Sequence, residues 1–232
     1  CLLNHLKMKI NLLIISLAII LFSCSDSEPK KEVKKTTKPT ITYIKAPVFN
    51  ADSAYQFVQK QVDFGYRIPN TAEHVACGDW MVAELNKYGA TVTEQTFKKK
   101  AYDLNVLTLR NIIGSFNPEA KKRILLAAHW DTRHVADRDI ENNDKPFDGA
   151  NDGGSGVGVL LEIARQISIN QPKVGVDIIF FDGEDYGQPE GSKFPQMQDS
   201  WCFGSQYWSV NRHTPNYTAE FGILLDMVGA PG

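Results

Sequence analysis

The chain has 232 residues, of which 43% are hydrophobic and 22% charged, and its formal net charge is −2. A chain of this length and apolar content can bury one sizeable core, which excludes a wholly disordered protein. The small negative charge gives no basic surface overall, so we expect no nucleic-acid partner.

The first 45 residues are predicted to form an export signal and a tether. Residues 1–23 hold a few upstream residues and then a lipoprotein signal peptide, whose apolar run at 12–22 is too short to span a bilayer. The run ends in LFSC, which resembles a bacterial lipobox and makes Cys24 the candidate for lipidation. A plain signal peptide with a chance cysteine is the alternative. Residues 24–45 are rich in Lys, Ser, Thr and Pro and predict a flexible tether. We therefore expect an exported lipoprotein, anchored in a membrane by lipid and periplasmic or outer-membrane-associated in a bacterium.

Residues 46–232 are predicted to form one α/β domain. Patterns typical of helices cover 51–63, 72–88, 157–167 and 205–210, and patterns typical of strands cover 91–97, 104–113, 124–128, 176–181 and 221–228. The uninterrupted apolar runs at 124–128 and 176–181 indicate strands buried on both faces. The alternation predicts a mostly parallel or mixed central sheet flanked by helices, with ligands gathered at the carboxyl ends of strands. Because the last strand lies so close to Gly232, we expect a C-terminal part of the domain to be missing from this sequence.

Four acidic or histidine-bearing phrases lie at strand ends or in a glycine-rich turn. They are AAHWDT with His129 and Asp131, GANDGGSG with Asp152, IIFFDGED with Glu184 and Asp185, and GILLDMVG with Asp226. Each phrase alone has a plainer interpretation as a loop histidine, a helix-capping aspartate or solvated turn acids. Together they predict a zinc enzyme, because imidazole and carboxylate groups are zinc ligands.

The adjacent acids Glu184 and Asp185 are expected to divide their work, so that one binds the metal and the other exchanges a proton. Asp131 is expected to orient the imidazole of His129 through its second ring nitrogen. Asp226 interrupts an apolar run, and we expect a buried strand carboxylate that needs a metal or a hydrogen-bonding partner.

Three further residues carry less information. Cys77 and Cys202 are far apart in the sequence, and an exported protein could join them by a disulfide, although nothing in the sequence shows that they meet. No C-x-x-C pair is present, which argues against a thiolate zinc site. Asp182 is expected to be a structural turn residue.

In these phrases the chain resembles the zinc-dependent exopeptidase superfamily of bacterial leucyl-type aminopeptidases, and within it the glutaminyl cyclases. The similarity runs from about Tyr66 to Gly232, and its cyclase-like parts are YRIP, RNIIGSFNPEAK, QDS and LDMVGAP. The spacing also favours a cyclase, because eighteen residues separate Asp185 from Gly204-Ser205, where aminopeptidases usually reach Gly-Ser within a few residues.

The resemblance implies one zinc ion, held by Asp152, Asp185 and a histidine beyond the end of this sequence. It implies Glu184 as the general acid/base and Asp226 as a carboxylate that hydrogen-bonds toward it. In a two-zinc site Asp152 would instead bridge the metals, and His129 and Asp226 would bind the second ion. Asp185 occupies a position where Glu is usual in animal cyclases, which leaves the number of ions open.

The reaction that the resemblance implies converts the N-terminal glutamine of peptides to pyroglutamate with release of ammonia. Peptides or proteins with N-terminal Gln are then the expected partners. Trp201 and Tyr186 are near the acidic pair and are expected to wall the substrate pocket, although each could also belong to the core. A metallo-aminopeptidase that releases N-terminal residues with water, and a catalytically inactive peptide-binding lipoprotein, are the alternatives.

Overall fold

The computed structural model describes residues 46–229, so the predicted signal peptide, Cys24 and the tether lie outside the described residues. Within this range five strands form one mixed sheet in the order β1-β2-β4-β3-β5. The strands are β1 (Thr91–Lys100), β2 (Val106–Phe116), β3 (Arg123–His129), β4 (Gly175–Phe181) and β5 (Phe221–Leu224). β2 pairs antiparallel with β1 and β4, whereas β3 runs parallel to β4 and β5. The predicted α/β fold with a parallel or mixed sheet is confirmed, in its mixed form.

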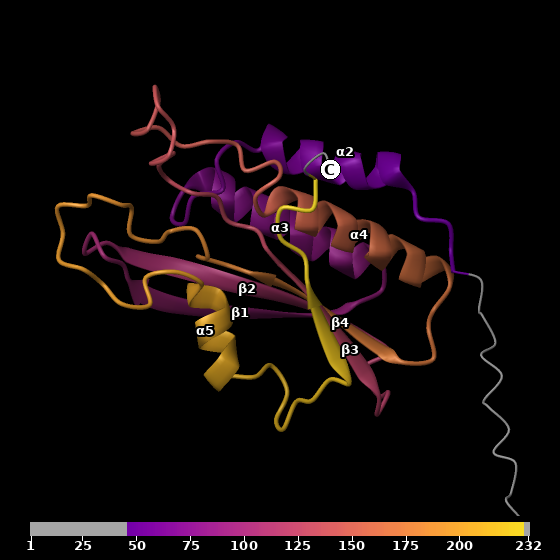
Figure 1. Ribbon diagram of the computed structural model, residues 1–232. Coiled ribbons are helices and arrows are strands. Elements are labelled where there is room, and N and C mark those ends of the chain that lie inside the picture. Colours follow the sequence, from indigo (N-terminus) through magenta and orange to yellow (C-terminus); the bar gives the residue numbers. More distant parts are fainter. Residues whose placement is uncertain (1–45, 230–232) are drawn as a thin grey trace, which may run out of the picture. The chain divides into compact units, whose positions relative to one another are not determined.

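Four described helices flank the sheet. They are α2 (Ala51–Asp63), α3 (Ala72–Lys87), α4 (Gly154–Ile169) and α5 (Phe203–Val210). Figure 1 shows α2, α3 and α4 over one face of the sheet and α5 over the other. Asn50 and Thr71 begin α2 and α3 by accepting hydrogen bonds from the backbone N–H groups of Ser53 and His74, which satisfies donors that a helix start leaves free.

The strand β4 lies in the middle of the core, and all seven of its residues are buried. Ile178 and Phe180 pack with α3 and α4 in the larger core cluster, while Ile179 and Phe181 pack toward α5 in a second cluster. Burial on both faces was predicted for this strand and is confirmed. In β3 the residues Ile124 and Leu125 are only half-buried, because the neighbouring β5 is short and open to solvent.

The last strand departs from the prediction. β5 has four residues, all of them exposed, and the predicted buried strand through residue 228 is wrong. The N–H of Leu225 still donates to the carbonyl of Ala127 at 2.8 Å, so the chain follows β3 for one more residue. Asp226 therefore follows the strand rather than lying within it, and its side chain is 39% exposed.

Two sequence-level questions are answered by the described residues. Cys77 and Cys202 both carry free thiols, so they do not form a disulfide. None of the helices within residues 46–229 combines the length and the apolar character needed to cross a membrane.

Candidate active site

The candidate site lies at the carboxyl ends of β3 and β4, which are neighbouring parallel strands. His129 ends β3 and is paired in register with Phe181, the last residue of β4. The acidic pair Glu184 and Asp185 follows β4 directly, so both loops leave the sheet at the same edge. This is where ligands bind in sheets of this type.

The structure brings five of the predicted side chains together at this edge. The Nε2 atom of His129 lies 2.9 Å from Oδ1 of Asp152 and 3.5 Å from Oδ1 of Asp226. Potential ligand atoms of His129, Asp152 and Asp185 all lie within 4.8 Å of one another, and so do those of His129, Glu184 and Asp226. The two groups share the imidazole, and its Nε2 atom faces both Asp152 and Asp226, so this nitrogen can ligate a cation in one group or the other.

Asp131 has a different part from the one predicted. Its Oδ1 and Oδ2 atoms accept the backbone N–H groups of Glu184 and Asp185 at 2.9 and 3.0 Å. Its Oδ1 atom lies 3.7 Å from Nδ1 of His129, within reach of an ion pair but too far for a hydrogen bond, and this ring nitrogen has no hydrogen-bond partner among the described residues. Asp131 therefore fixes the backbone of the acidic pair, and the predicted hydrogen bond that orients the imidazole is absent between these described residues.

The turn that carries Asp152 packs directly against the imidazole. Gly153 has φ +75°, and a Cβ atom there would lie 2.8 Å from Cε1 of His129. Only glycine combines this backbone conformation with so close an approach. The glycine-rich phrase therefore places the Asp152 carboxylate beside Nε2 of His129.

The loop after β4 is braced from both sides. The N–H groups of Cys202, Phe203 and Gly204 at the start of α5 donate to the carbonyls of Glu184, Gly183 and Asp182. The Asp182 carboxylate is fully buried, lies 2.9 Å from Nε2 of His74, and accepts the N–H of Arg110 at 2.6 Å. Asp182 is thus structural, as expected, but its partners are distant in sequence, so no local pattern identifies them.

The site concentrates negative charge in a poorly solvated place. Burial raises the pKa of Glu184 and of Asp185, and the nearby Asp131 raises both further. Burial alone would lower the pKa of His129, but the interactions with Asp131 and Asp152 outweigh it, and the net pKa lies well above its ordinary value. The causes of the three shifts are burial and the crowding of several carboxylates around one imidazole, a place where added positive charge would be favourable.

A divalent cation would compensate the negative charge of these carboxylates. The Oδ2 atom of Asp185 is buried and has no hydrogen-bond partner among the described residues, and an unpaired buried acceptor is costly. Carboxylate oxygens with an imidazole nitrogen form a donor set that zinc accepts. The residues present therefore suit a zinc ion between His129, Asp152 and Asp185.

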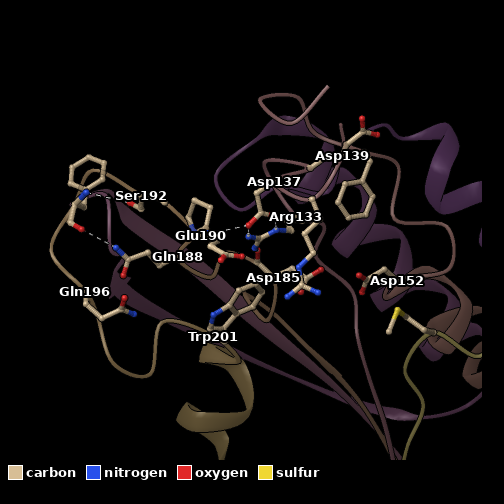
Figure 2. A pocket seen from close by; sticks show the side chains of 17 residues that line it. Arg133, Asp137, Asp139, Asp152, Asp185, Gln188, Glu190, Ser192, Gln196 and Trp201 are labelled. Atoms are coloured by element: carbon tan, nitrogen blue, oxygen red, sulfur yellow. Dashed lines mark hydrogen bonds and ion pairs between the residues drawn. The ribbon is translucent and has the colours of Figure 1, made fainter. Parts of the chain in front are cut away.

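A cavity of about 960 Å³ opens beside the cluster. Asp152, Asp185 and Trp201 line it (Figure 2), and Gln188 and Glu190 from the following loop form part of its wall. The placement of Trp201 agrees with its predicted position in a pocket. The cavity is large enough for the end of a peptide.

Tyr186 does not line this cavity, so its predicted place in the pocket wall is corrected. Its ring stacks on His134 with centroids 4.2 Å apart, and its hydroxyl donates to Asp103 Oδ2 at 3.0 Å. Asp185 lines the cavity, while Tyr186 packs in a core cluster with Tyr102.

Arg133 lines the cavity and was missed at the sequence level. Its guanidinium forms two hydrogen bonds with the Asp137 carboxylate, at 2.7 and 2.6 Å, and donates to the backbone carbonyl of Asp185 at 3.1 Å. It also lies 4.5 Å from the ring of Trp201. An Arg and an Asp four residues apart are common in any chain, and bonds to backbone carbonyls leave no pattern in a single sequence, so no specific signal identifies Arg133.

This combination of fold and site defines an exopeptidase-like α/β protein with a candidate metal centre at the ends of two parallel strands. Residues 111–232 match the family described as Peptidase family M28. The chain belongs to this family, which confirms the resemblance seen in its motifs.

The chain is similar to the glutaminyl cyclase of Bacteroides thetaiotaomicron bound to N-acetylhistamine, with 57% identity and a TM-score of 0.77 over 80% of this chain and 64% of that chain. It is also similar to a leucine aminopeptidase precursor from Bacteroides thetaiotaomicron, with 56% identity and a TM-score of 0.78 over 81% of this chain and 65% of that chain. The glutaminyl-peptide cyclotransferase of Bos taurus is 31% identical over 142 residues, which make up 52% of this chain and 37% of that protein. The chain thus spans less than two thirds of the length of these relatives.

Proposed function

We propose that the protein is a zinc-dependent glutaminyl cyclase, which converts the N-terminal glutamine of peptides to pyroglutamate and releases ammonia. The observation that carries the proposal is the clustering of Asp152, Asp185 and Glu184 around His129, with Asp152 and Asp185 lining one cavity. Similarity to cyclases over most of the described residues supports it.

The reaction needs a carbonyl activator and a group that moves one proton. Zinc, when bound by Asp152 and Asp185, supplies a Lewis acid for the γ-carboxamide carbonyl. The α-amine nitrogen of the substrate attacks the γ-carbon, a lactam C–N bond forms, and the C–N bond to ammonia breaks. Glu184 takes the proton from the attacking amine and returns it to the departing ammonia. The raised pKa of Glu184 suits this exchange.

Asp226 is proposed to act on Glu184 rather than on the substrate. Ligand atoms of the two side chains lie within 4.8 Å of each other, and the charge of Asp226 contributes to the raised pKa of Glu184. Trp201, which lines the cavity with 41% of its surface exposed, is proposed to contact the substrate side chain.

A single zinc ion is the proposed stoichiometry, and an aminopeptidase is the second candidate function. The observation that favours the aminopeptidase is the second group of ligand atoms, from His129, Glu184 and Asp226, which could serve a second ion if Asp152 and Asp185 hold the first without His129. Similarity to a leucine aminopeptidase precursor also supports this candidate. Metal analysis of the purified full-length protein would give one zinc per chain for the cyclase and two for the aminopeptidase.

The deciding experiment measures two activities on the full-length protein. Ammonia release from a Gln-initiated peptide should exceed hydrolysis of a leucine anilide, and Glu184→Gln should lower kcat for ammonia release at least about a hundredfold. Glu119→Gln, an exposed acid on another loop, is the matched control. Anilide hydrolysis without ammonia release would favour the aminopeptidase. If the protein shows neither activity but still binds zinc, the result would favour a catalytically inactive, peptide-binding protein.

We also propose that Cys24 is lipidated and anchors the protein in a membrane of an exporting bacterium, on the basis of the lipobox-like sequence alone. Labelling with an alkyne fatty acid should mark the wild type and not Cys24→Ser. Wild-type protein found only in the soluble fraction, without label, would contradict the anchor.

A further inference from the structure

Arg67 is fully buried and lies between the two loops that carry His129 and Asp152. Its backbone carbonyl accepts the N–H of Thr132, three residues after His129, at 3.1 Å. Its guanidinium donates to the carbonyl of Asp148 and, at 2.9 Å, to that of Gly149. One residue thus joins the β3 loop to the turn that leads into α4.

The bonds of this guanidinium are unusual for a buried cation. Arg123, which is also largely buried, pairs directly with the Asp177 carboxylate through two hydrogen bonds of 2.7 Å. Arg67 instead donates to backbone carbonyls and has no carboxylate within hydrogen-bonding distance among the described residues. Burial of a charge without a bonded countercharge is costly. That cost is tolerated here at the turn that carries Asp152, a proposed metal ligand.

The turn is held at the two points on either side of Asp152. The Gly149 carbonyl accepts both the Arg67 guanidinium and the N–H of Gly154, the latter at 3.1 Å. The carbonyl of Gly154 in turn accepts Nε2 of Gln61, a buried residue of α2, at 3.0 Å. Asp152 lies between these fixed carbonyls, so its backbone has little freedom to move relative to His129.

We propose that Arg67 is a positioning residue for Asp152: its buried guanidinium holds the 148–154 turn at the distance from the β3 loop that a shared metal ion requires. The inference rests on the proposed zinc-binding function. Outer groups that fix a ligand typically change metal affinity by ten- to a hundredfold when they are replaced.

Arg67→Lys is the informative variant, because it keeps the charge but cannot span two neighbouring carbonyls as a guanidinium does. Arg67→Gln removes the charge and keeps one donor group. For the variant that folds, the zinc dissociation constant, measured by competition with a chelator, should rise about tenfold or more. The visible absorption of the cobalt-substituted protein should also change, since it reports the geometry of the ligands.

Arg123→Lys is the matched control, because Arg123 is a largely buried arginine near the opposite end of β3. It should lower the thermal midpoint of the metal-free protein at least as much as Arg67→Lys does, while leaving zinc affinity and the cobalt spectrum unchanged. If the wild type binds no zinc, the proposed function fails. If the wild type binds zinc and the Arg67 variants bind it equally well, or if neither variant folds, Arg67 is structural only and the inference is overturned.

Discussion

Replacement of Asp131 by asparagine tests whether one carboxylate organises the acidic pair. In the wild type each oxygen of Asp131 accepts one backbone N–H, from Glu184 and from Asp185. The asparagine amide can accept only one of them, and its own NH₂ group must face the other. The two side chains have nearly the same volume, so the effect comes from these hydrogen bonds and from the lost charge rather than from packing.

The expected loss of stability is about 3 kcal/mol, because a charge-assisted bond is lost and a buried donor is left unpaired. Relief of repulsion acts in the opposite direction, since Asp131 raises the pKa of both Glu184 and Asp185. Asparagine is neutral and removes that repulsion. The two effects differ in sign, so the measured sign decides which of them is larger.

Urea unfolding of the metal-free protein, followed by far-UV circular dichroism, measures the difference. With a slope of about 2 kcal/mol/M, the midpoint should fall by roughly 1.5 M urea. Asp139→Asn is the matched control, because Asp139 also accepts two backbone N–H groups, from Glu141 and Asn142, but is exposed to solvent. Its midpoint should hardly change. An Asp131→Asn protein as stable as the wild type, or more stable, would refute the reasoning.

Gly153→Ala should lower the free energy of unfolding by about 2–3 kcal/mol and weaken zinc binding, because the new Cβ would lie 2.8 Å from Cε1 of His129 and the residue keeps a strained positive φ. Gly89→Ala is the control in thermal unfolding, because Gly89 has φ +85° but open space around the new Cβ, and it should cost less stability. Equal losses of stability in the two variants would count against the close contact. Burial, and after it the charge of Arg133, lowers the pKa of His134 to about 4. As the pH falls below 6.5, His134 therefore binds a proton in the unfolded chain but not yet in the folded protein. The free energy of unfolding should then fall by on the order of 2 kcal/mol between pH 6.5 and 4, allowing for partial solvent access. His134→Asn should flatten this slope in urea titrations, and parallel slopes would contradict the assignment. Removal of zinc by a chelator should lower the thermal midpoint, because zinc at a hundred times its dissociation constant adds about 2.7 kcal/mol; an unchanged midpoint would count against a zinc site in the folded protein.

Local signals predicted the helices and strands well and their pairing poorly. The helix at 51–63 has its predicted bounds, and Asn50 supplies the cap. The pattern at 104–113 indicated a strand, but nothing in it shows that β2 runs antiparallel to both of its neighbours. Strand direction depends on connections and on partners distant in sequence, which local periodicity does not contain.

At the site, the side chains that can bind a metal ion were identified from the sequence. The residues that hold these side chains in position were missed. His129, Asp152 and Asp185 were found because their residue types and strand-end positions are informative. Arg67 acts through backbone carbonyls more than eighty residues away, and such contacts leave no motif. Asp226 was misplaced because apolar neighbours predicted burial, whereas the neighbouring Leu224 is 58% exposed.

Two hydrogen bonds hold the backbone of Asp185, and they restrict how long the side chain at this position can be. Its N–H is held by Asp131 and its carbonyl by Arg133, so the point from which the side chain projects is fixed on both sides. A glutamate at this position could not retreat along the backbone to accommodate an extra methylene group. The carboxylate oxygens of a glutamate would therefore lie beyond the place that the Asp185 oxygens occupy now. The length of the aspartate side chain suits the fixed backbone of this loop, so replacing Asp185 by Glu without a change in the loop should misplace the ion.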